Sequence, residues 1–274
     1  MKYLLLLTIF LASCSDESNV LSGPFLIKDG ITYHQTTTKP IRGELHSFYA
    51  NGQLKDRTPY NKGLRDGLFE AFYENGQLRE RVTYLSGIKN GLQETFAADG
   101  KLTQSLPLVD GIAHGVRTQH FTVDNKDIRY HVGLVNGLVD GFYEHYMDDV
   151  LVQQGVHSNG RLDGVFTNFH SNSRVKETYR YDDGKKNGSI EGYWSTGEKA
   201  LLGRYNDGNA DGDFRVFDLK GDLRASWRCN AGVYLVESMF FSIPDIPKTP
   251  LELLIKENRY QKDPCGKLLD EYWQ

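Results

Sequence analysis

Aromatic and polar residues alternate along most of this chain in short segments, which are separated by glycine, asparagine and aspartate. In GLRDGLFEAFYENGQL, residues 63–78, an aromatic segment leads into Asn75-Gly76, and the second segment LRERVTY follows at residues 78–84. Neither segment is long enough for a helix, and neither shows the 3.6-residue spacing of one. Asn-Gly and Asp-Gly pairs accept the positive φ of tight hairpin turns. The pattern therefore predicts β-hairpins.

The hairpin unit is repeated along the chain. The units align on the second glycine of each G-x-x-x-G motif, here termed the repeat glycine. The repeat glycines are Gly67, Gly91, Gly115, Gly141, Gly164, Gly188 and Gly212, and Gly43, a forerunner at the right spacing, is counted with them. The steps from Gly43 onward are 24, 24, 24, 26, 23, 24 and 24 residues. One hairpin cannot bury its own aromatic residues, whereas stacked hairpins bury them against their neighbours. We therefore predict an all-β fold, an elongated antiparallel sheet or solenoid of about eight hairpins.

Aromatic residues keep fixed positions relative to the repeat glycine. Position five, counted from that glycine, is aromatic in every unit except the one with His120, and the column is Phe48, Phe72, Phe96, Tyr146, Phe169, Tyr193 and Phe217. Position two holds Phe69, Tyr143, Phe166 and Phe214. Position 17 holds Tyr60, Tyr84, Tyr181 and Tyr205, and in the last unit Cys229, which we expect to point into the stack. Positions two and five face opposite sides of a flat strand unless a bulge realigns them, and the sequence leaves both arrangements open.

These residues resemble the variant MORN repeat, the kind found in the YwqK-type antitoxin family. The nearest matches are SFYANGQLK at 47–55 and AFYENGQLR at 71–79, and GITYHQTTTKPIRGEL at 30–45 is similar to the opening unit of that family. The middle of the chain departs from the pattern, because HFTVDNKDI carries an insertion and MDDVL lacks the turn glycine. The resemblance implies a sheet of hairpins and a toxin-neutralising or immunity-like role.

The N-terminus, MKYLLLLTIFLASC, has a short apolar run after Lys2. The run is too short to span a membrane and is typical of a secretory signal. Small residues before Cys14 resemble the lipobox of bacterial lipoproteins, which implies a lipid-modified Cys14. We therefore expect a signal peptide at 1–13 and a tether at 14–24; the alternative is a plain signal peptide with an incidental cysteine. Ser15 is not the aspartate that retains enteric lipoproteins at the inner membrane, so the expected location is the outer membrane, on its periplasmic or surface face.

The predicted repeat domain covers 25–229, and the composition changes after it. Thr249 is a candidate N-cap with Pro250 at the first helical position, and Asp263-Pro264 ends the pattern. We predict a C-terminal cap at 230–274 with a helix at 249–261; the alternative for this helix is partner binding. Cys229 and Cys265 could form a disulfide in an oxidising envelope, or remain two separate thiols.

The net charge and its distribution limit the classes of ligand that we expect the repeats to bind. The net charge is −4, both signs are interspersed, and no basic block is present. This argues against nucleic acid and against anionic lipid as ligands of the repeats. We expect a monomer that touches the membrane only through Cys14.

The sequence contains only weak matches to metal-binding motifs. DGNADGDFRVFD, residues 207–218, matches the front of a calcium loop, but its Asp-Gly pairs belong to the loop that every unit has, and Asp218 replaces the expected glutamate. The histidines lack metal-ligand spacing, and we expect them on strand faces: His34, His46, His114, His120, His131, His145, His157 and His170. We therefore predict no metal, no cofactor and no enzymatic activity.

The sequence favours a lipid-anchored, protein-binding scaffold in the cell envelope, with an unidentified toxin or envelope protein as its partner. Two alternatives stay open. One is a glycan- or lipid-binding surface module, and the other is a structural spacer without a specific ligand.

Overall fold

The computed structural model describes residues 20–241, which form 25 strands and no helix. The all-β class and the antiparallel hairpins are thereby confirmed. The predicted signal peptide, Cys14 and the predicted helix at 249–261 lie outside the described residues. Within them, no helix is long and apolar enough to cross a membrane.

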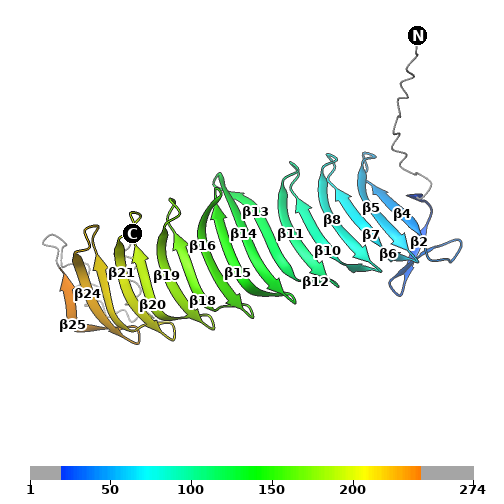
Figure 1. Cartoon of the computed structure of the whole chain (residues 1–274). Coiled ribbons are helices and arrows are strands. Elements are labelled where there is room, and N and C mark those ends of the chain that lie inside the picture. The colour runs from blue at the N-terminus through cyan, green and yellow to red at the C-terminus, as the bar shows by residue number, and fades with distance from the viewer. Residues whose placement is uncertain (1–19, 242–274) are drawn as a thin grey trace, which may run out of the picture. The chain divides into compact units, whose positions relative to one another are not determined.

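The chain divides into two compact units. Within each unit, successive strands lie side by side (Figure 1). Among the described residues, unit 1 comprises 20–102 and 108–111, and unit 2 comprises 103–107 and 112–241. The strands of unit 1 are β1 (Val20–Leu21), β2 (Phe25–Lys28), β3 (Ile31–His34), β4 (Gly43–Phe48), β5 (Leu54–Asn61), β6 (Leu64–Arg65), β7 (Gly67–Phe72), β8 (Leu78–Leu85), β9 (Ile88–Lys89) and β10 (Gly91–Phe96). Residues of β11 (Leu102–Val109) belong to both units. The strands of unit 2 are β12 (Ile112–Ala113), β13 (Gly115–Val123), β14 (Lys126–Val135), β15 (Leu138–Met147), β16 (Val150–Ser158), β17 (Arg161–Leu162), β18 (Gly164–Phe169), β19 (Val175–Asp182), β20 (Lys185–Tyr193), β21 (Lys199–Asn206), β22 (Asn209–Ala210), β23 (Gly212–Phe217), β24 (Leu223–Asn230) and β25 (Val233–Phe241).

Two kinds of turn join the strands of a repeat. At the G-x-x-x-G end, Lys62 and Gly63 both have positive φ, 50° and 77°, which is the signature of a type I′ turn. At the other end, Gln77 N–H donates to Asn75 Oδ1 at 3.0 Å, so the asparagine side chain closes the turn. Both turns depend on local chemistry, which explains why the sequence pattern located them.

The repeat glycine is required by its backbone. Gly67 has φ of 119°, a region that side chains with a Cβ rarely adopt. A Cβ there would also lie only 2.9 Å from Cγ of Pro59. The strand that follows therefore begins at a position that only glycine suits.

The irregular middle of the chain keeps the hairpin without a turn glycine. Asp148 and Asp149 have φ of 49° and 62°, and they form the two-residue turn between β15 and β16. Asp124 and Asn125 do the same between β13 and β14. Aspartate and asparagine tolerate this left-handed conformation better than other side chains, so the sequence departures there change the loop and not the fold.

The sheet continues past the predicted boundary at 229. Ala231 and Gly232 form another turn of the G-x-x-x-G kind, with φ of 48° and 84°. Gly232 N–H donates to the carbonyl of Ala210 at 2.8 Å, and β25 pairs antiparallel with β24. The region assigned from sequence to a cap beginning at 230 therefore starts with a further strand. The sequence pattern does not reveal this strand, because Val236 occupies the position of the repeat glycine.

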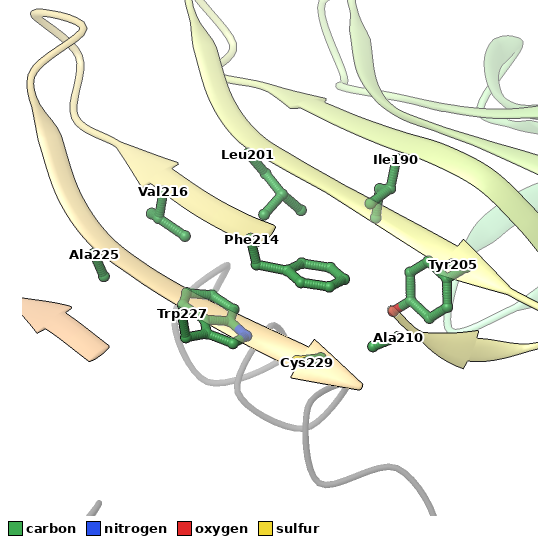
Figure 2. Close-up of a cluster of buried hydrophobic side chains, with 9 residues drawn as sticks. All are labelled: Ile190, Leu201, Tyr205, Ala210, Phe214, Val216, Ala225, Trp227 and Cys229. Carbon is green, nitrogen blue, oxygen red and sulfur yellow. The ribbon is translucent and has the colours of Figure 1, made fainter. Parts of the chain in front are cut away.

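A cluster of buried side chains forms the core of unit 2 (Figure 2). It consists of Ile190, Leu201, Tyr205, Ala210, Phe214, Val216, Ala225, Trp227 and Cys229. The rings of Phe214 and Trp227 stack at 5.7 Å with an interplanar angle of 10°. Cys229 is 2% exposed and takes part in a disulfide. Its predicted partner Cys265 lies outside the described residues, so that pairing stays a prediction.

Candidate binding faces

Positions two and five lie on opposite faces of the sheet. In β7, Phe69 lies opposite Val82 and Phe72 lies opposite Leu78, with a register shift between Ala71 and Phe72. The extra residue that causes the shift is in β8, so side chains still alternate along β7. We define face A by the side chains at positions two and four after each repeat glycine, and face B by those at positions one, three and five. The question that the sequence left open is thereby answered: both faces carry aromatic residues.

Aromatic side chains of face A in unit 2 contact one another. Tyr130 stacks on His145 at 4.5 Å, and Tyr143 stacks on Phe166 at 6.2 Å. His157 meets the Tyr143 ring edge-on at 5.8 Å. Because each ring packs against its neighbour, much of the ring surface is already in contact within the protein.

Burial changes the protonation behaviour of this group of rings. Burial, with a smaller effect from Tyr130, raises the pKa of Tyr143 to about 12. Burial lowers the pKa of His157 below its ordinary value. Nδ1 of His157 and Nε2 of His145 are buried and make no hydrogen bond. Burial therefore favours the uncharged forms of Tyr143 and His157 within this packed layer.

Face B of unit 1 combines ion pairs with exposed apolar side chains. Arg57 pairs with Glu70, and Arg81 pairs with Glu94, in both cases across neighbouring strands. The hydrogen bond to Glu94 raises the pKa of Arg81. Beside these pairs Phe48 is 58% exposed. This face presents aromatic and charged groups side by side.

Apolar residues at position one add to face B. In unit 1 they are Leu68 and Leu92, which are 48% and 47% exposed. In unit 2 Val116, Phe142 and Val165 are exposed at the same position. Unlike the rings of face A, these side chains are open to solvent.

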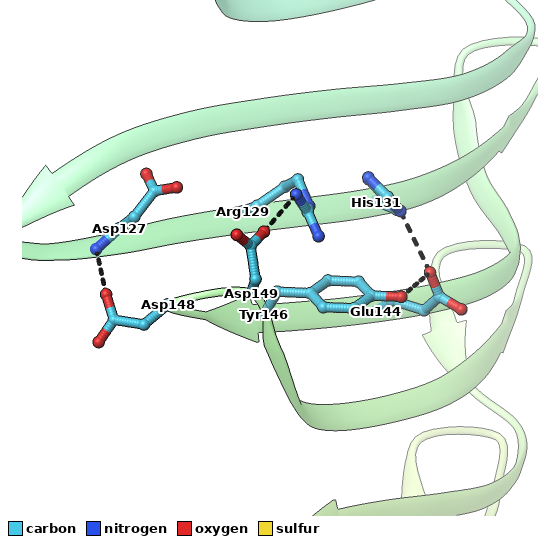
Figure 3. A network of polar contacts seen from close by, with 7 residues as sticks. All are labelled: Asp127, Arg129, His131, Glu144, Tyr146, Asp148 and Asp149. Atoms are coloured by element: carbon cyan, nitrogen blue, oxygen red, sulfur yellow. Dashed lines mark hydrogen bonds and ion pairs between the residues drawn. The ribbon is translucent and has the colours of Figure 1, made fainter. Parts of the chain in front are cut away.

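A polar network occupies face B over β14 and β15 (Figure 3). Arg129 lies over the Tyr146 ring at 4.5 Å and pairs with Asp149 at 2.9 Å. Glu144 accepts from the Tyr146 hydroxyl at 3.1 Å and lies 3.2 Å from Nδ1 of His131. The ring contact with Arg129 and the hydrogen bond to Glu144 together fix the position of Tyr146.

Within each unit, the members of the predicted aromatic column lie on face B of that unit. Phe48 is exposed, and the other members are half-buried: Phe72, Phe96, Tyr146, Phe169, Tyr193 and Phe217. The side chain that follows a column residue in one repeat donates a hydrogen bond to the backbone of the column residue in the next repeat. The Tyr73 hydroxyl donates to the carbonyl of Phe96 at 2.8 Å, and Nε1 of Trp194 donates to the carbonyl of Phe217 at 3.2 Å.

Position 17 lies on the packed face, where Tyr84, Tyr205 and Cys229 are buried. The sequence predicts that Cys229 points into the stack, and its side chain lies in the buried cluster.

The structure separates the first and last acids of the candidate calcium loop, Asp207 and Asp218. Asp207 lies in a turn and pairs with Lys185 at 2.6 Å. Asp218 lies beyond the far end of β23, and it closes the next turn by accepting from Lys220 N–H at 2.9 Å. The six residues of β23 span roughly 20 Å, so these carboxylates cannot share an ion. Across residues 20–241, no group of three or more His, Cys, Asp or Glu side chains is placed to hold a metal.

A family model described as MORN repeat variant matches residues 65–85. The match covers the β7–β8 hairpin. No curated protein matches the chain. A repeat of this kind suggests a repeat-based role in binding or as a scaffold.

Three arginines on face B of unit 2 were not found by sequence reasoning. They are Arg180, Arg204 and Arg228, which are separated by 24 residues each. The signal was present in the repeat alignment, but a search for blocks of adjacent basic residues does not detect it.

Proposed function

We propose that this protein is a non-enzymatic scaffold that binds another protein through face B. The observation that supports the proposal best is the exposure of apolar side chains at position one of this face, together with the half-buried aromatic rings at position five. Aromatic residues and arginine are enriched at the centres of protein interfaces. Scattered single apolar residues need no explanation, but here they recur at one position of successive repeats.

Face B is preorganised for such contact. In unit 1, cross-strand ion pairs hold Arg57 and Arg81. Hydrogen bonds from Tyr73 and Trp194 fix the backbone at position five of the repeat that follows each of them. A surface whose side chains are already ordered loses less conformational entropy on binding. This rigidity favours a specific protein partner.

Glycan binding is supported less well. Sugars stack on ring faces that are open to solvent, whereas Tyr130, Tyr143 and His145 of face A pack against other rings. A lipid-binding role for the repeats also has little support, because the chain has a net charge of −4.

The cellular setting belongs to the same proposal. A lipid on Cys14 would hold the protein, as a monomer, on the outer membrane. The resemblance to the YwqK-type family suggests that the partner is a toxin or another envelope protein, and an immunity-like role would agree with export. A membrane-held scaffold of this kind needs no cofactor.

The experiment that tests the proposal uses the full chain, with its own N-terminus and a C-terminal tag, in the native host. Envelope extracts are captured with the wild type, with the face B variant Phe96→Ser/Tyr193→Ser, and with Ile27→Ser as the control. Ile27 is 73% exposed but lies in the β2–β3 hairpin, outside the repeat sheet.

We expect one protein at near-equal stoichiometry with the wild type and with the control, and its loss with the face B variant. Equal capture by all three proteins would contradict a role of face B. Capture of no stoichiometric partner by folded wild type would contradict the scaffold function.

A further inference from the structure

Face B of unit 2 carries a row of arginines, although the net charge of the whole chain is −4. Arg180 lies in β19, Arg204 in β21 and Arg228 in β24. They lie opposite Val165, Ser189 and Asp213, which are position-one residues of face B. Each arginine is two strands from the next, which places neighbouring arginines about 10 Å apart.

Most of this positive charge is not neutralised within the protein. Arg228 forms a bidentate pair with Asp213, at 2.6 and 3.0 Å. Arg180 and Arg204 are exposed, and no carboxylate of the described residues pairs with either. Arg215, also exposed, adds a further charge on this face. In unit 1, by contrast, Arg57 and Arg81 of face B are both paired with glutamates.

The fold does not require arginine in this row. The equivalent position, eight residues before the next repeat glycine, is occupied in the other repeats by Pro59, Thr83, Pro107, Gly133 and Val156. Those strands pair in the same register with residues of widely different size and polarity. A guanidinium there therefore serves something other than the hairpin.

Two hollows lie on the same face at position five of the strands, roughly 13 Å along the strands from the arginine row at the level of position one. The first, about 550 Å³, is lined by Arg174, Thr178 and Tyr193 among others. The second, about 350 Å³, is lined by Glu198, Lys199, Phe217 and Lys220 among others. Tyr193 and Phe217 are position-five residues, so the hollows recur with the repeat. Each combines an aromatic wall with at least one basic side chain, and the second also contains Glu198. The aromatic walls suit apolar side chains of a partner.

We propose that face B over β18–β24 docks an acidic, extended segment of the partner protein. This inference rests on the proposed scaffold function and specifies the chemistry of the partner. Carboxylates of the segment would pair with Arg180, Arg204 and Arg215, and apolar side chains of the same partner would enter the two hollows. A polyproline II segment presents one face every three residues, or about 9.3 Å, which agrees with the spacing of the arginine row.

The geometry favours a protein segment over the other anionic ligands. The row is one residue wide and has Asp213 and Glu191 beside it, so its field is local. Membranes and nucleic acids are recognised through larger areas of unbalanced positive charge, and the chain as a whole is acidic. Arginine pairs with single carboxylates in a defined geometry, which matches a short acidic motif.

The test measures binding of fluorescein-labelled peptides to the full-length protein by anisotropy at low ionic strength. The probe has four Glu-Pro-Pro triplets, and the comparison peptide has the same composition with its glutamates contiguous. The variants are Arg180→Gln/Arg204→Gln and, as a control with half the charge change, Lys126→Gln. Lys126 is exposed in the same unit, at the start of β14 and away from the row. Thermal unfolding confirms that each variant is folded.

We expect the triplet peptide to bind more tightly than the contiguous one, and the double arginine variant to weaken this binding about tenfold or more. Lys126→Gln should change it less than twofold. Absence of peptide binding, or equal weakening by Lys126→Gln and the arginine variant, would overturn the proposal. Arginine-dependent binding to vesicles with anionic phosphatidylglycerol or to single-stranded DNA, without peptide binding, would also overturn it.

This experiment can fail while the proposed function stands. If Phe96→Ser/Tyr193→Ser loses the captured partner but the arginine variant keeps it, face B binds protein without the arginine row. If the arginine variant alone loses that partner, the acidic segment is supported and the role of the position-five column is not.

Discussion

At the scale of single residues, glycines of face A make room for large rings. Gly155 lies beneath Phe166, and a Cβ at this position would be 2.5 Å from Cδ2 of that ring. Gly203 lies beneath Phe214 in the same way, with Ile190 on its other side. Neither glycine has a positive φ, so it is the packing and not the backbone that excludes a side chain.

Gly203→Ala should therefore destabilise unit 2. The new Cβ would overlap the Phe214 ring and lie 3.0 Å from Cγ2 of Ile190, which costs about 1–3 kcal/mol of unfolding free energy. Chemical denaturation measures the loss, and Ser189→Ala, an exposed site on β20, is the control. Combining Gly203→Ala with Phe214→Leu should reduce the loss; simple additivity would show that the ring is not its cause.

The raised pKa of Tyr143 predicts a dependence of stability on alkaline pH. The pKa of this hydroxyl is about 12 in the folded protein and about 10 when unfolded, so the unfolded chain loses its proton first. The contribution of Tyr143 is complete below pH 10 and is lost as the pH rises toward 12. In Tyr143→Phe the unfolding free energy should fall less steeply over this range, while below pH 9 the two proteins should show the same pH dependence. Identical slopes between pH 10 and 12 would contradict the assignment.

At the scale of elements, each repeat is defined by its two turns. The residue before the first glycine of each G-x-x-x-G motif is left-handed, with φ between 48° and 50°: Lys62, Ser86, Asp110, Asn136, Asn159, Asp183, Asp207 and Ala231. Successive turns are linked by backbone bonds, such as Gly87 N–H to the carbonyl of Arg65 at 2.7 Å. The turn is thus the most regular part of the repeat.

Ala231→Asn should stabilise the last turn. Alanine gains nothing to offset the steric cost of φ at 48°, whereas asparagine tolerates this conformation. We expect an increase of about 0.5–1 kcal/mol in unfolding free energy, and a decrease of similar size for the reverse change Asn136→Ala at the equivalent position. Thermal and chemical unfolding measure both. A decrease for both substitutions would show that turn conformation does not limit stability here.

Much of this element level could be predicted from sequence. Asn75-Gly76 and Lys62-Gly63 are local signals, and the strands between them follow from alternation. The last turn could not be recognised, because Ala231 and Val236 replace the residues that identify the motif. Only the bond from Gly232 to Ala210 and the pairing of β25 place it in the repeat.

At the scale of the whole molecule, the expected attachment to a membrane depends on Cys14. Cys14→Ser should move the protein from the membrane fraction to the soluble fraction and abolish incorporation of labelled fatty acid. The physical reason is that stable anchoring needs at least two acyl chains, which lipoproteins carry on this residue. Fractionation of the native host measures the change, and Ser13→Ala, which keeps a small residue before Cys14, is the control. Unchanged membrane association of Cys14→Ser would remove the anchor from the proposed function.

The sequence by itself determined the period of the repeat, the all-β class and the two turns of each hairpin. These features depend on neighbouring residues, such as glycine at positive φ in Gly63, and neighbouring residues are what a sequence pattern records. The tertiary structure alone decided that Phe69 and Phe72 face opposite sides, because this depends on which strand carries the register shift. It also decided that Arg180, Arg204 and Arg228 form one row, because pairing of separate strands brings residues 24 positions apart to about 10 Å.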